Sequence, residues 1–208
     1  MTPQTDVVLP PDLDELSPDG RELLFTTART ANTYADEPVS DATLRSIWHL
    51  AKWGPTSANL QPLRATFVRT PEAKAKLVGH LFDNNKAKTE SAPVAAILAA
   101  DTRFHDHVPT VLPYRPELKD MLEGDPDRRA TMQNMNASMQ AAYFIMAVRA
   151  HGLAAGPMGG FARAGVDADF FAGTTWASFL VVNIGKPGPN PWFDRLPRLG
   201  DDDVLDWA

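Results

Sequence analysis

A run of hydrogen-bonding side chains follows a predicted helix in the segment WGPTSANLQP, residues 53–62. Glycine and proline end the helix there, and the polar groups come from Trp53, Thr56, Ser57, Asn59 and Gln61. Asn and Ser side chains often stabilise a turn by bonding to the nearby backbone. A simple connection needs fewer donors and acceptors than these. Taken alone, the segment predicts a well-capped turn after a helix.

A second candidate is the pair His105-x-His107, with Asp101 and Asp106 close by. These residue types can bind a metal ion, but no third ligand follows at helical spacing. Both histidines also lie in an irregular stretch. The pattern favours a solvated loop, and we predict no metal site.

The glycine-rich segment GPMGGF, residues 156–161, could approach a phosphate closely or could be a tight turn after a helix. Several other chemistries lack their motifs. The sequence has no GxGxxG after a strand, no Walker A lysine loop and no GxSxG elbow. It also has no cysteine, which excludes thiolate nucleophiles and zinc–cysteine sites.

Composition indicates a packed globular protein. Hydrophobic residues make up 44% of the 208 residues and charged residues 22%. The net charge of −6 and the pI of about 5.3 argue against a nucleic-acid-binding surface. The start of the chain is acidic and proline-rich, unlike a signal peptide, and no apolar run is long enough to cross a membrane. We therefore expect a cytoplasmic protein with no membrane or nucleic-acid partner.

Hydrophobic periodicity predicts a layered α+β fold. An N-terminal arm (1–20) precedes a single domain (21–208). We expect helices at 21–31, 71–82 and 130–156, the last closed by Gly152. A further helix is expected to begin at a cap formed by Ser40 or Asp41 and to end at Gly54. Strands are expected at 65–70, 92–101 and 178–185. We expect a polar stretch at 83–91, and an irregular excursion or lid that selects the substrate at 102–129.

Four segments occur in an order that resembles the nitroreductase superfamily of FMN-dependent flavoproteins. They are KWGPTSANLQP, ART at residues 28–30, GLAAGPMGGF and the final RLPRL. The resemblance covers roughly residues 23–200. Within the superfamily, the sequence is most similar to the malonic semialdehyde reductase (3-hydroxypropanoate dehydrogenase) branch of pyrimidine degradation.

The resemblance implies a nitroreductase-like fold, with a central, mostly antiparallel sheet flanked by helices. It also implies a homodimer that binds FMN at the subunit interface. Arg29 and Arg198 would bind the phosphate, as guanidinium groups suit phosphate oxygens, and Lys88 and Asn85 would approach the ribityl chain or the ring edge. The cofactor-binding residues implied are Arg29, Thr30, Ala31, Pro55, Thr56, Ser57, Asn59, Asn85, Lys88, Asn136, Pro157, Met158, Gly159, Gly160 and Arg198.

The sequence departs from the superfamily pattern at two places. Gly159 stands where many nitroreductases have a glutamate, and Thr30 and Ala31 replace polar partners of the phosphate, for which Asn32 could compensate. Simpler interpretations stay open at several positions. Arg29 could be a surface arginine, and Asn136 an ordinary buried helix asparagine.

The resemblance implies that the protein is an NAD(P)H oxidoreductase with a ping-pong cycle of hydride transfer. The flavin would carry the chemistry, and no catalytic side chain is expected. Its substrate would be malonic semialdehyde, reduced to 3-hydroxypropanoate, or a similar small aldehyde. Candidates to bind the substrate carboxylate are Arg64, Arg103 and Arg115. Two alternatives remain: a broad-specificity reductase of nitroaromatics, quinones or enones, and a flavin-binding protein without turnover. The sequence does not distinguish NADH from NADPH.

Overall fold

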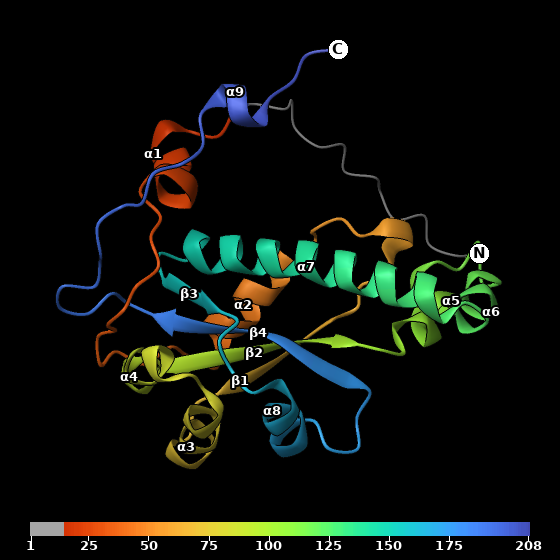
Figure 1. Ribbon diagram of the computed structural model, residues 1–208, viewed down its shortest axis with the longest axis horizontal. Helices are drawn as coiled ribbons and strands as arrows, with labels where there is room; N and C mark the ends of the chain where they lie inside the picture. Colours follow the sequence, from red (N-terminus) through yellow and green to blue (C-terminus); the bar gives the residue numbers. More distant parts are fainter. Residues whose placement is uncertain (1–14) are drawn as a thin grey trace, which may run out of the picture.

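The computed structural model describes residues 15–208, and a four-stranded sheet lies at its centre (Figure 1). Its strands run in the order β1-β2-β4-β3 and every neighbouring pair is antiparallel. Their bounds are β1 Leu63–Val68, β2 Val94–Asp101, β3 Ala154–Met158 and β4 Trp176–Gly185. The predicted α+β fold with a central antiparallel sheet is confirmed.

Helices cover both faces of the sheet, because successive side chains of a strand point to opposite faces. In β2, Ala96 and Leu98 pack against α2 (Asp41–Ala51) and α7 (Pro126–Ala150). Ala95 and Ile97 belong to the other core, together with residues of α3 (Pro71–His80) and α8 (Arg163–Phe170). Burial on both faces explains why β2 reads as an unbroken apolar run.

Local signals mark the limits of the two helices on the first face. Ser40 caps α2, since its hydroxyl accepts a hydrogen bond from the backbone N–H of Thr43 at 3.1 Å. The side chain of Asp125 caps α7 by accepting from the backbone N–H of Arg128. Gly152 follows α7 with φ at +65°, a left-handed conformation that suits glycine.

The polar stretch at 83–91 is a helix, and the prediction of an irregular excursion at 102–129 was wrong. Residues 83–91 form α4 (Asp83–Ser91), a helix whose composition is too polar to show a hydrophobic stripe. The expected excursion at 102–129 contains the 3₁₀ helix η3 (Phe104–His107), the helices α5 (Val108–Val111) and α6 (Leu118–Glu123), and the first turn of α7. These short elements share a core of their own that includes Phe104, Leu118 and Leu122. They are too short to show a period in the sequence.

The prediction of one helix over 130–156 was also wrong at its end. The helix stops at Ala150, and residues 154–158 form the edge strand β3. A strand holding Gly156 and Pro157 has weak β propensity, and proline is tolerated because β3 lies at an edge of the sheet.

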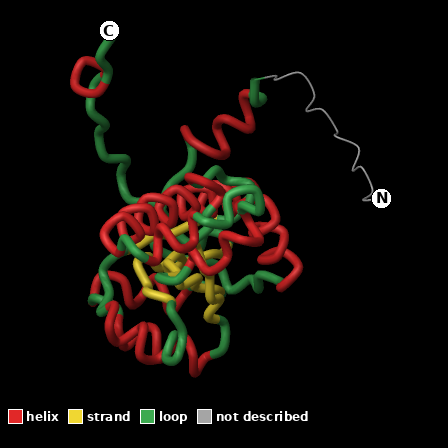
Figure 2. The backbone as a smooth tube through the Cα atoms, turned by 90° about the vertical axis from the view of Figure 1, so that its right-hand side faces the viewer, coloured by secondary structure: helices red, strands yellow, loops and turns green. Residues whose placement is uncertain are grey.

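Both ends of the described chain extend away from the sheet (Figure 2). At the start, helix α1 (Pro18–Arg21) and the π-helical turn η1 (Glu22–Thr26) replace the expected helix at 21–31. The predicted arm at 1–20 lies outside the described residues up to residue 14, and part of α1 occupies its end. At the other end, an extended segment leads to α9 (Asp201–Val204). Within residues 15–208, no helix is both long and apolar enough to cross a membrane.

Candidate functional site

The loop after α2 has an unusual backbone. Three of its non-glycine residues have positive φ angles: Ala58 at 52°, Asn59 at 54° and Gln61 at 45°. The left-handed conformation costs an L-amino acid roughly 1–2 kcal/mol per residue. Such conformations persist where surrounding contacts impose them, and they cluster at functional sites. The contacts that impose this loop come from two other elements.

Asn136 of α7 holds the loop from behind. Its side chain is fully buried, and its Oδ1 accepts a hydrogen bond from the backbone N–H of Ser57 at 2.7 Å. Its Nδ2 donates to the carbonyl of Met132 at 2.7 Å. Both ends of this amide are therefore engaged within the protomer, and the structure places Asn136 as a support of the predicted pocket wall.

Asn59 and Gln61 brace the exposed side of the loop. Asn59 donates from Nδ2 to the carbonyl of Val111 in α5 at 2.7 Å, which ties the loop to that helix. Gln61 donates from Nε2 to Oδ1 of Asn59 at 2.9 Å, and its backbone N–H reaches the hydroxyl of Thr56 at 3.4 Å. Sequence analysis assigned no specific role to Gln61.

Trp53 does not brace this loop. Its side chain is 78% exposed, and the ammonium of Lys52 lies 5.3 Å from its ring centroid.

We call Pro55, Thr56, Ser57 and Asn59, with Asn136 behind them, the loop group.

A second set of predicted residues meets where α4 approaches the end of β3. Asn85 is buried, and its Nδ2 donates to the carbonyl of Gly160 at 2.9 Å. The backbone carbonyl of Asn85 accepts a hydrogen bond from the hydroxyl of Thr89, and this hydroxyl in turn accepts one from Nδ2 of Asn183 at 3.0 Å. The sulfur of Met158 lies 3.8 Å from the same hydroxyl. We call Asn85, Lys88 and residues 157–160 the glycine group.

The two glycines of this group differ sharply in their surroundings. A Cβ on Gly160 would lie 2.7 Å from Nδ2 of Asn85, so only glycine allows this close approach. A Cβ on Gly159 would have no atom within 4 Å. The position where many nitroreductases have a glutamate thus faces open space.

Two of the basic residues in the predicted set, Lys88 and Arg29, are half-buried and lack counter-charges among residues 15–208. Lys88 is half-buried and forms no ion pair there, and burial lowers the pKa of its ammonium group. Arg29 is also half-buried and forms no ion pair in that range. Near Arg29, Thr30 is exposed and Ala31 is fully buried against Tyr34. Asn32, expected to compensate for lost phosphate partners, instead bonds through its backbone N–H to the carbonyl of Pro191 at 2.9 Å.

The predicted residues do not all meet within one protomer. The loop group is tied to α5, whereas α4 with Asn85 and Lys88 lies at the opposite end of the molecule (Figure 1). Arg198 lies exposed in the extended C-terminal segment, where its guanidinium donates only to the neighbouring carbonyls of Leu196 and Pro197 among the described groups.

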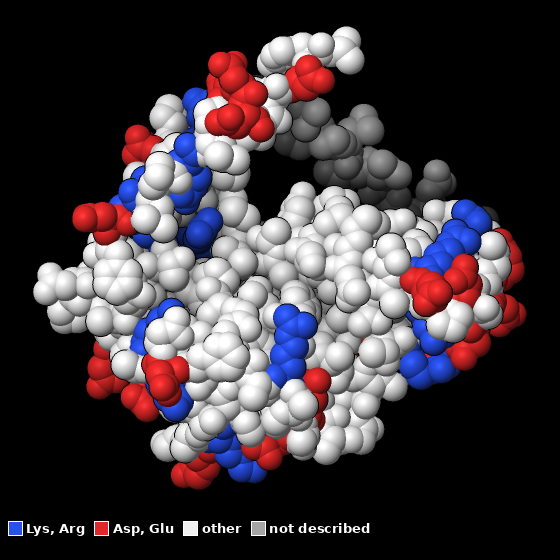
Figure 3. All heavy atoms as spheres, viewed as in Figure 1, with Lys and Arg blue, Asp and Glu red and all other residues white. Residues whose placement is uncertain are grey.

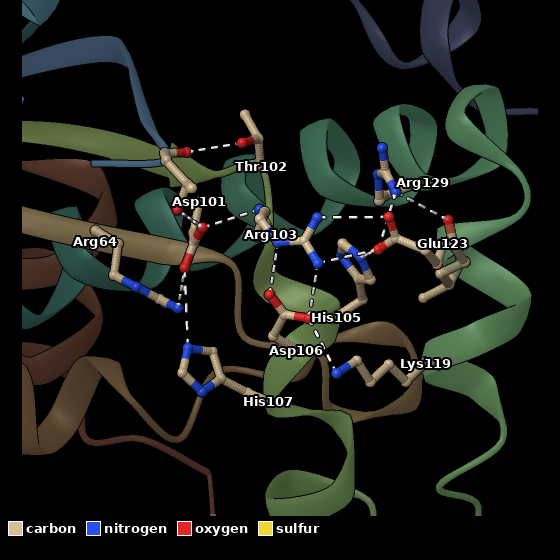
Figure 4. A network of polar contacts seen from close by, with 12 residues as sticks. Arg64, Asp101, Thr102, Arg103, His105, Asp106, His107, Lys119, Glu123 and Arg129 are labelled. Carbon is tan, nitrogen blue, oxygen red and sulfur yellow. Dashed lines mark hydrogen bonds and ion pairs between the residues drawn. The ribbon is translucent and has the colours of Figure 1, made fainter. Parts of the chain in front are cut away.

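The segment after β2 is held by ion pairs (Figure 4). Arg103 contacts Asp106 at 2.7 Å and Glu123 at 3.1 Å, and Nε2 of the buried His105 lies 2.6 Å from Glu123. The hydrogen bond from Arg103 lowers the pKa of Asp106 to about 2. His105, Asp106 and Glu123 lie close enough to bind a metal. However, Arg103 pairs with both carboxylates, and Arg129 also approaches Glu123, so cations already neutralise the cluster.

The three cations proposed for a substrate carboxylate are all paired. Arg64 contacts Asp101 at 2.6 Å, Arg103 is engaged as described, and Arg115 lies 3.6 Å from Glu117. None of them is a free cation in this protomer.

Comparison with known proteins agrees with this geometry. The model of the Nitroreductase family matches residues 26–186. The chain belongs to the nitroreductase family. It is 57% identical to a protein of Streptomyces coelicolor that is provisionally named NADH dehydrogenase/NAD(P)H nitroreductase, over 89% of this chain and 92% of that one. A similarly named protein of Streptomyces griseus is 47% identical, over 91% and 96%.

Among solved structures, the fold is similar to a provisionally named nitroreductase of Exiguobacterium sibiricum in complex with FMN. The TM-score is 0.82 at 19% identity, and the match covers 93% of this chain and 99% of that one. The matched family region contains every predicted cofactor-binding residue except Arg198.

Proposed function

We propose that this protein is an FMN-dependent NAD(P)H oxidoreductase. The observation that carries the proposal is the family match, which spans both the loop group and the glycine group. The names of the Streptomyces relatives support NAD(P)H as the reductant, and the E. sibiricum complex supports FMN as the cofactor.

The residues present fit FMN. A phosphate monoester needs fixed positive charge, which the unpaired Arg29 offers. An isoalloxazine ring needs flat, open surface with polar groups at its edges. The space at Gly159 and the backbone around it offer such a surface, and the loop group adds hydroxyl and amide groups.

The chain would hold and polarise this cofactor with the residues described. When bound, FMN accepts a hydride from NAD(P)H and passes reducing equivalents to the oxidised substrate. Lys88 would stabilise negative charge on the bound flavin, because it is half-buried and forms no ion pair among residues 15–208. Asn136 keeps the N–H of Ser57 occupied and the loop backbone rigid. No side-chain nucleophile is required.

We propose that FMN binds between two copies of the chain, the loop group of one copy meeting the glycine group of the other. Their separation within a protomer supports this arrangement. So does the outer face of α7, where Met135, Met139 and Tyr143 are exposed at helical spacing. Figure 3 shows that the surface over the middle of α7 is largely free of charged side chains. Exposed apolar surface of this kind is typical of a protein interface.

The C-terminal segment supports the same dimer. Val204, Leu205 and Trp207 are exposed there, among Asp201, Asp202, Asp203 and Asp206. A groove of about 650 Å³ runs between α2 and the free edge of β1 and carries complementary groups: the cation Arg45 and the aromatic side chains of Trp48, Phe67 and Trp176. An acidic, apolar segment from a second copy fits such a groove by charge and by hydrophobic contact.

The substrate we propose is a small aldehyde of the malonic semialdehyde type, on the basis of the sequence resemblance. A second candidate is a neutral electron-poor acceptor, such as a nitroaromatic, a quinone or an enone. The pairing of Arg64, Arg103 and Arg115 favours this second candidate, because a carboxylate substrate would need an available cation.

Anaerobic spectroscopy tests these proposals. The purified protein, reconstituted with FMN, should lose its yellow colour when NADH or NADPH is added. Stopped-flow reoxidation by malonic semialdehyde is then compared with reoxidation by a nitroaromatic and by an enone. Faster reoxidation by the aldehyde supports the first substrate class, and the reverse order supports the second. Failure to bind FMN, or a flavin that stays oxidised with both nucleotides, contradicts the proposed function.

A further inference from the structure

The half-buried arginines divide into two kinds. Among residues 15–208 they are Arg29, Arg64, Arg129 and Arg149. Arg64 pairs with Asp101, and Arg129 lies 3.7 Å from Glu123. Arg29 and Arg149 form no ion pair with any described carboxylate. A charge that is partly removed from water without a counter-ion is unfavourable, so a bound anion would stabilise the guanidinium groups of Arg29 and Arg149.

The two unpaired arginines line one cavity. It has a volume of about 160 Å³, and its other walls come from η1, the end of α7, the start of β3 and the C-terminal segment. Since water occupies about 30 Å³ in the liquid, the cavity has room for a group the size of a phosphate. Leu153 and Trp192 line the same cavity.

The hydrogen bonds of Arg149 leave much of its guanidinium free. Its Nη1 donates to the carbonyl of Leu24 at a long 3.3 Å and lies 4.0 Å from the sulfur of Met146. Its Nε is buried and has no partner among the described atoms. Burial lowers the pKa of Arg149, as expected for a cation that lacks a neighbouring carboxylate. A guanidinium with unused donors is well suited to bind oxygen atoms of a phosphate.

We propose that Arg149 is a second guanidinium of the phosphate subsite, binding the FMN phosphate together with Arg29. The proposal rests on the proposed function, and it adds a residue that lies outside the set of cofactor-binding positions implied by the sequence. It identifies the ligand chemistry as a phosphate monoester. Riboflavin, which has the same ring and ribityl chain without the phosphate, is therefore the matched probe.

The test measures the affinity of the apoprotein for FMN and for riboflavin, by quenching of flavin fluorescence. Arg149→Met removes the charge and keeps the length of the side chain. It should weaken FMN binding on the order of 10- to 100-fold, the range of one charge-assisted hydrogen-bonding group, and leave riboflavin binding unchanged. Arg149→Lys should recover part of the loss. Arg128→Met, at an exposed arginine on the same helix, should change neither affinity.

The comparison separates binding from folding. If Arg149 only supports η1 through Leu24, its replacement will weaken FMN and riboflavin equally, and this outcome overturns the proposal. Unchanged affinity for both flavins also overturns it. If the wild-type protein binds neither flavin, the proposed function itself fails, and the assignment of Arg149 fails with it.

Discussion

The loop group and the glycine group differ in how their polar atoms are used. In the loop group, the amides of Asn59 and Asn136 are bonded within the protomer, and strained backbone is held in place. In the glycine group, Lys88 forms no ion pair among residues 15–208, and Gly159 borders open space. The first is a preformed wall. The second is an open surface, and the ammonium group of Lys88 there has no counter-charge among residues 15–208.

This difference predicts where substitutions will act. Changes in the loop group should reduce stability and ligand binding together, because its side chains serve the fold. Changes at Lys88 or Arg29 should alter ligand binding with little loss of stability. Arg29→Ala should release FMN while the free energy of unfolding stays nearly the same.

The largest effect on stability is expected for Asn136→Ala. It removes two short hydrogen bonds and leaves the N–H of Ser57 without its acceptor, at roughly 1–2 kcal/mol for each bond. We expect a loss of about 3 kcal/mol in the free energy of unfolding, measured by urea denaturation, and weaker FMN binding. Asn134→Ala, at an exposed position on the same helix, serves as the control. A loss below about 1 kcal/mol would show that the wall does not depend on Asn136.

The two adjacent glycines form the next comparison. Gly160→Ala places a Cβ against Asn85 and should cost about 1–3 kcal/mol, as overpacking does. Gly159→Ala meets no neighbour and should change stability by less than about 0.5 kcal/mol. Thermal unfolding of both variants measures this difference. Equal losses would mean that the close contact between Gly160 and Asn85 is absent in solution.

A smaller gain is expected for Ala58→Gly. Glycine removes the left-handed strain of about 1–2 kcal/mol but loses about 0.5–1 kcal/mol through added freedom of the unfolded chain. The protein should become more stable by roughly 0.5–1 kcal/mol in urea denaturation. Ala87→Gly, on the exposed side of α4, should instead lower stability. A loss at both positions would argue against strain at Ala58.

The smallest effect concerns the ion pairs that link η3 to α6. Arg103 lowers the pKa of Asp106 to about 2, below the ordinary value near 3.9. The contribution of this carboxylate is therefore complete above about pH 5 and is lost as the pH falls towards 2. Asp106→Asn should cost less than about 1 kcal/mol at neutral pH, with a difference from wild type that shrinks on acidification. A difference that stays constant down to pH 2 would contradict this assignment.

The sequence predicted the parts of the fold that have a clear period or a clear boundary. The apolar run of β2, the cap at Ser40 and the stop at Gly152 all have local physical causes. It failed at α4 and β3, where packing against the sheet outweighs weak local preference.

The candidate site shows the same limit. Proline, glycine and amide residues indicated the loop, and the structure brings Asn85 and Gly160 together. That these residues bind FMN stays a prediction. The hydrogen bonds of Asn136 and Gln61 depend on long-range placement, which composition and spacing do not encode. The pairing of Arg64, Arg103 and Arg115 could not be foreseen for the same reason.

Hybrid dimers test the central claim that the two groups combine across subunits to bind FMN. One chain would carry Gly159→Trp, which fills the open space of the glycine group, and the other Ser57→Trp, which obstructs the loop group. Each variant alone should retain little FMN. Co-expressed and purified through two different tags, the hybrid should recover one intact site of two and bind about half the FMN of the wild-type dimer. A hybrid that forms but binds no more FMN than either variant alone would contradict the account.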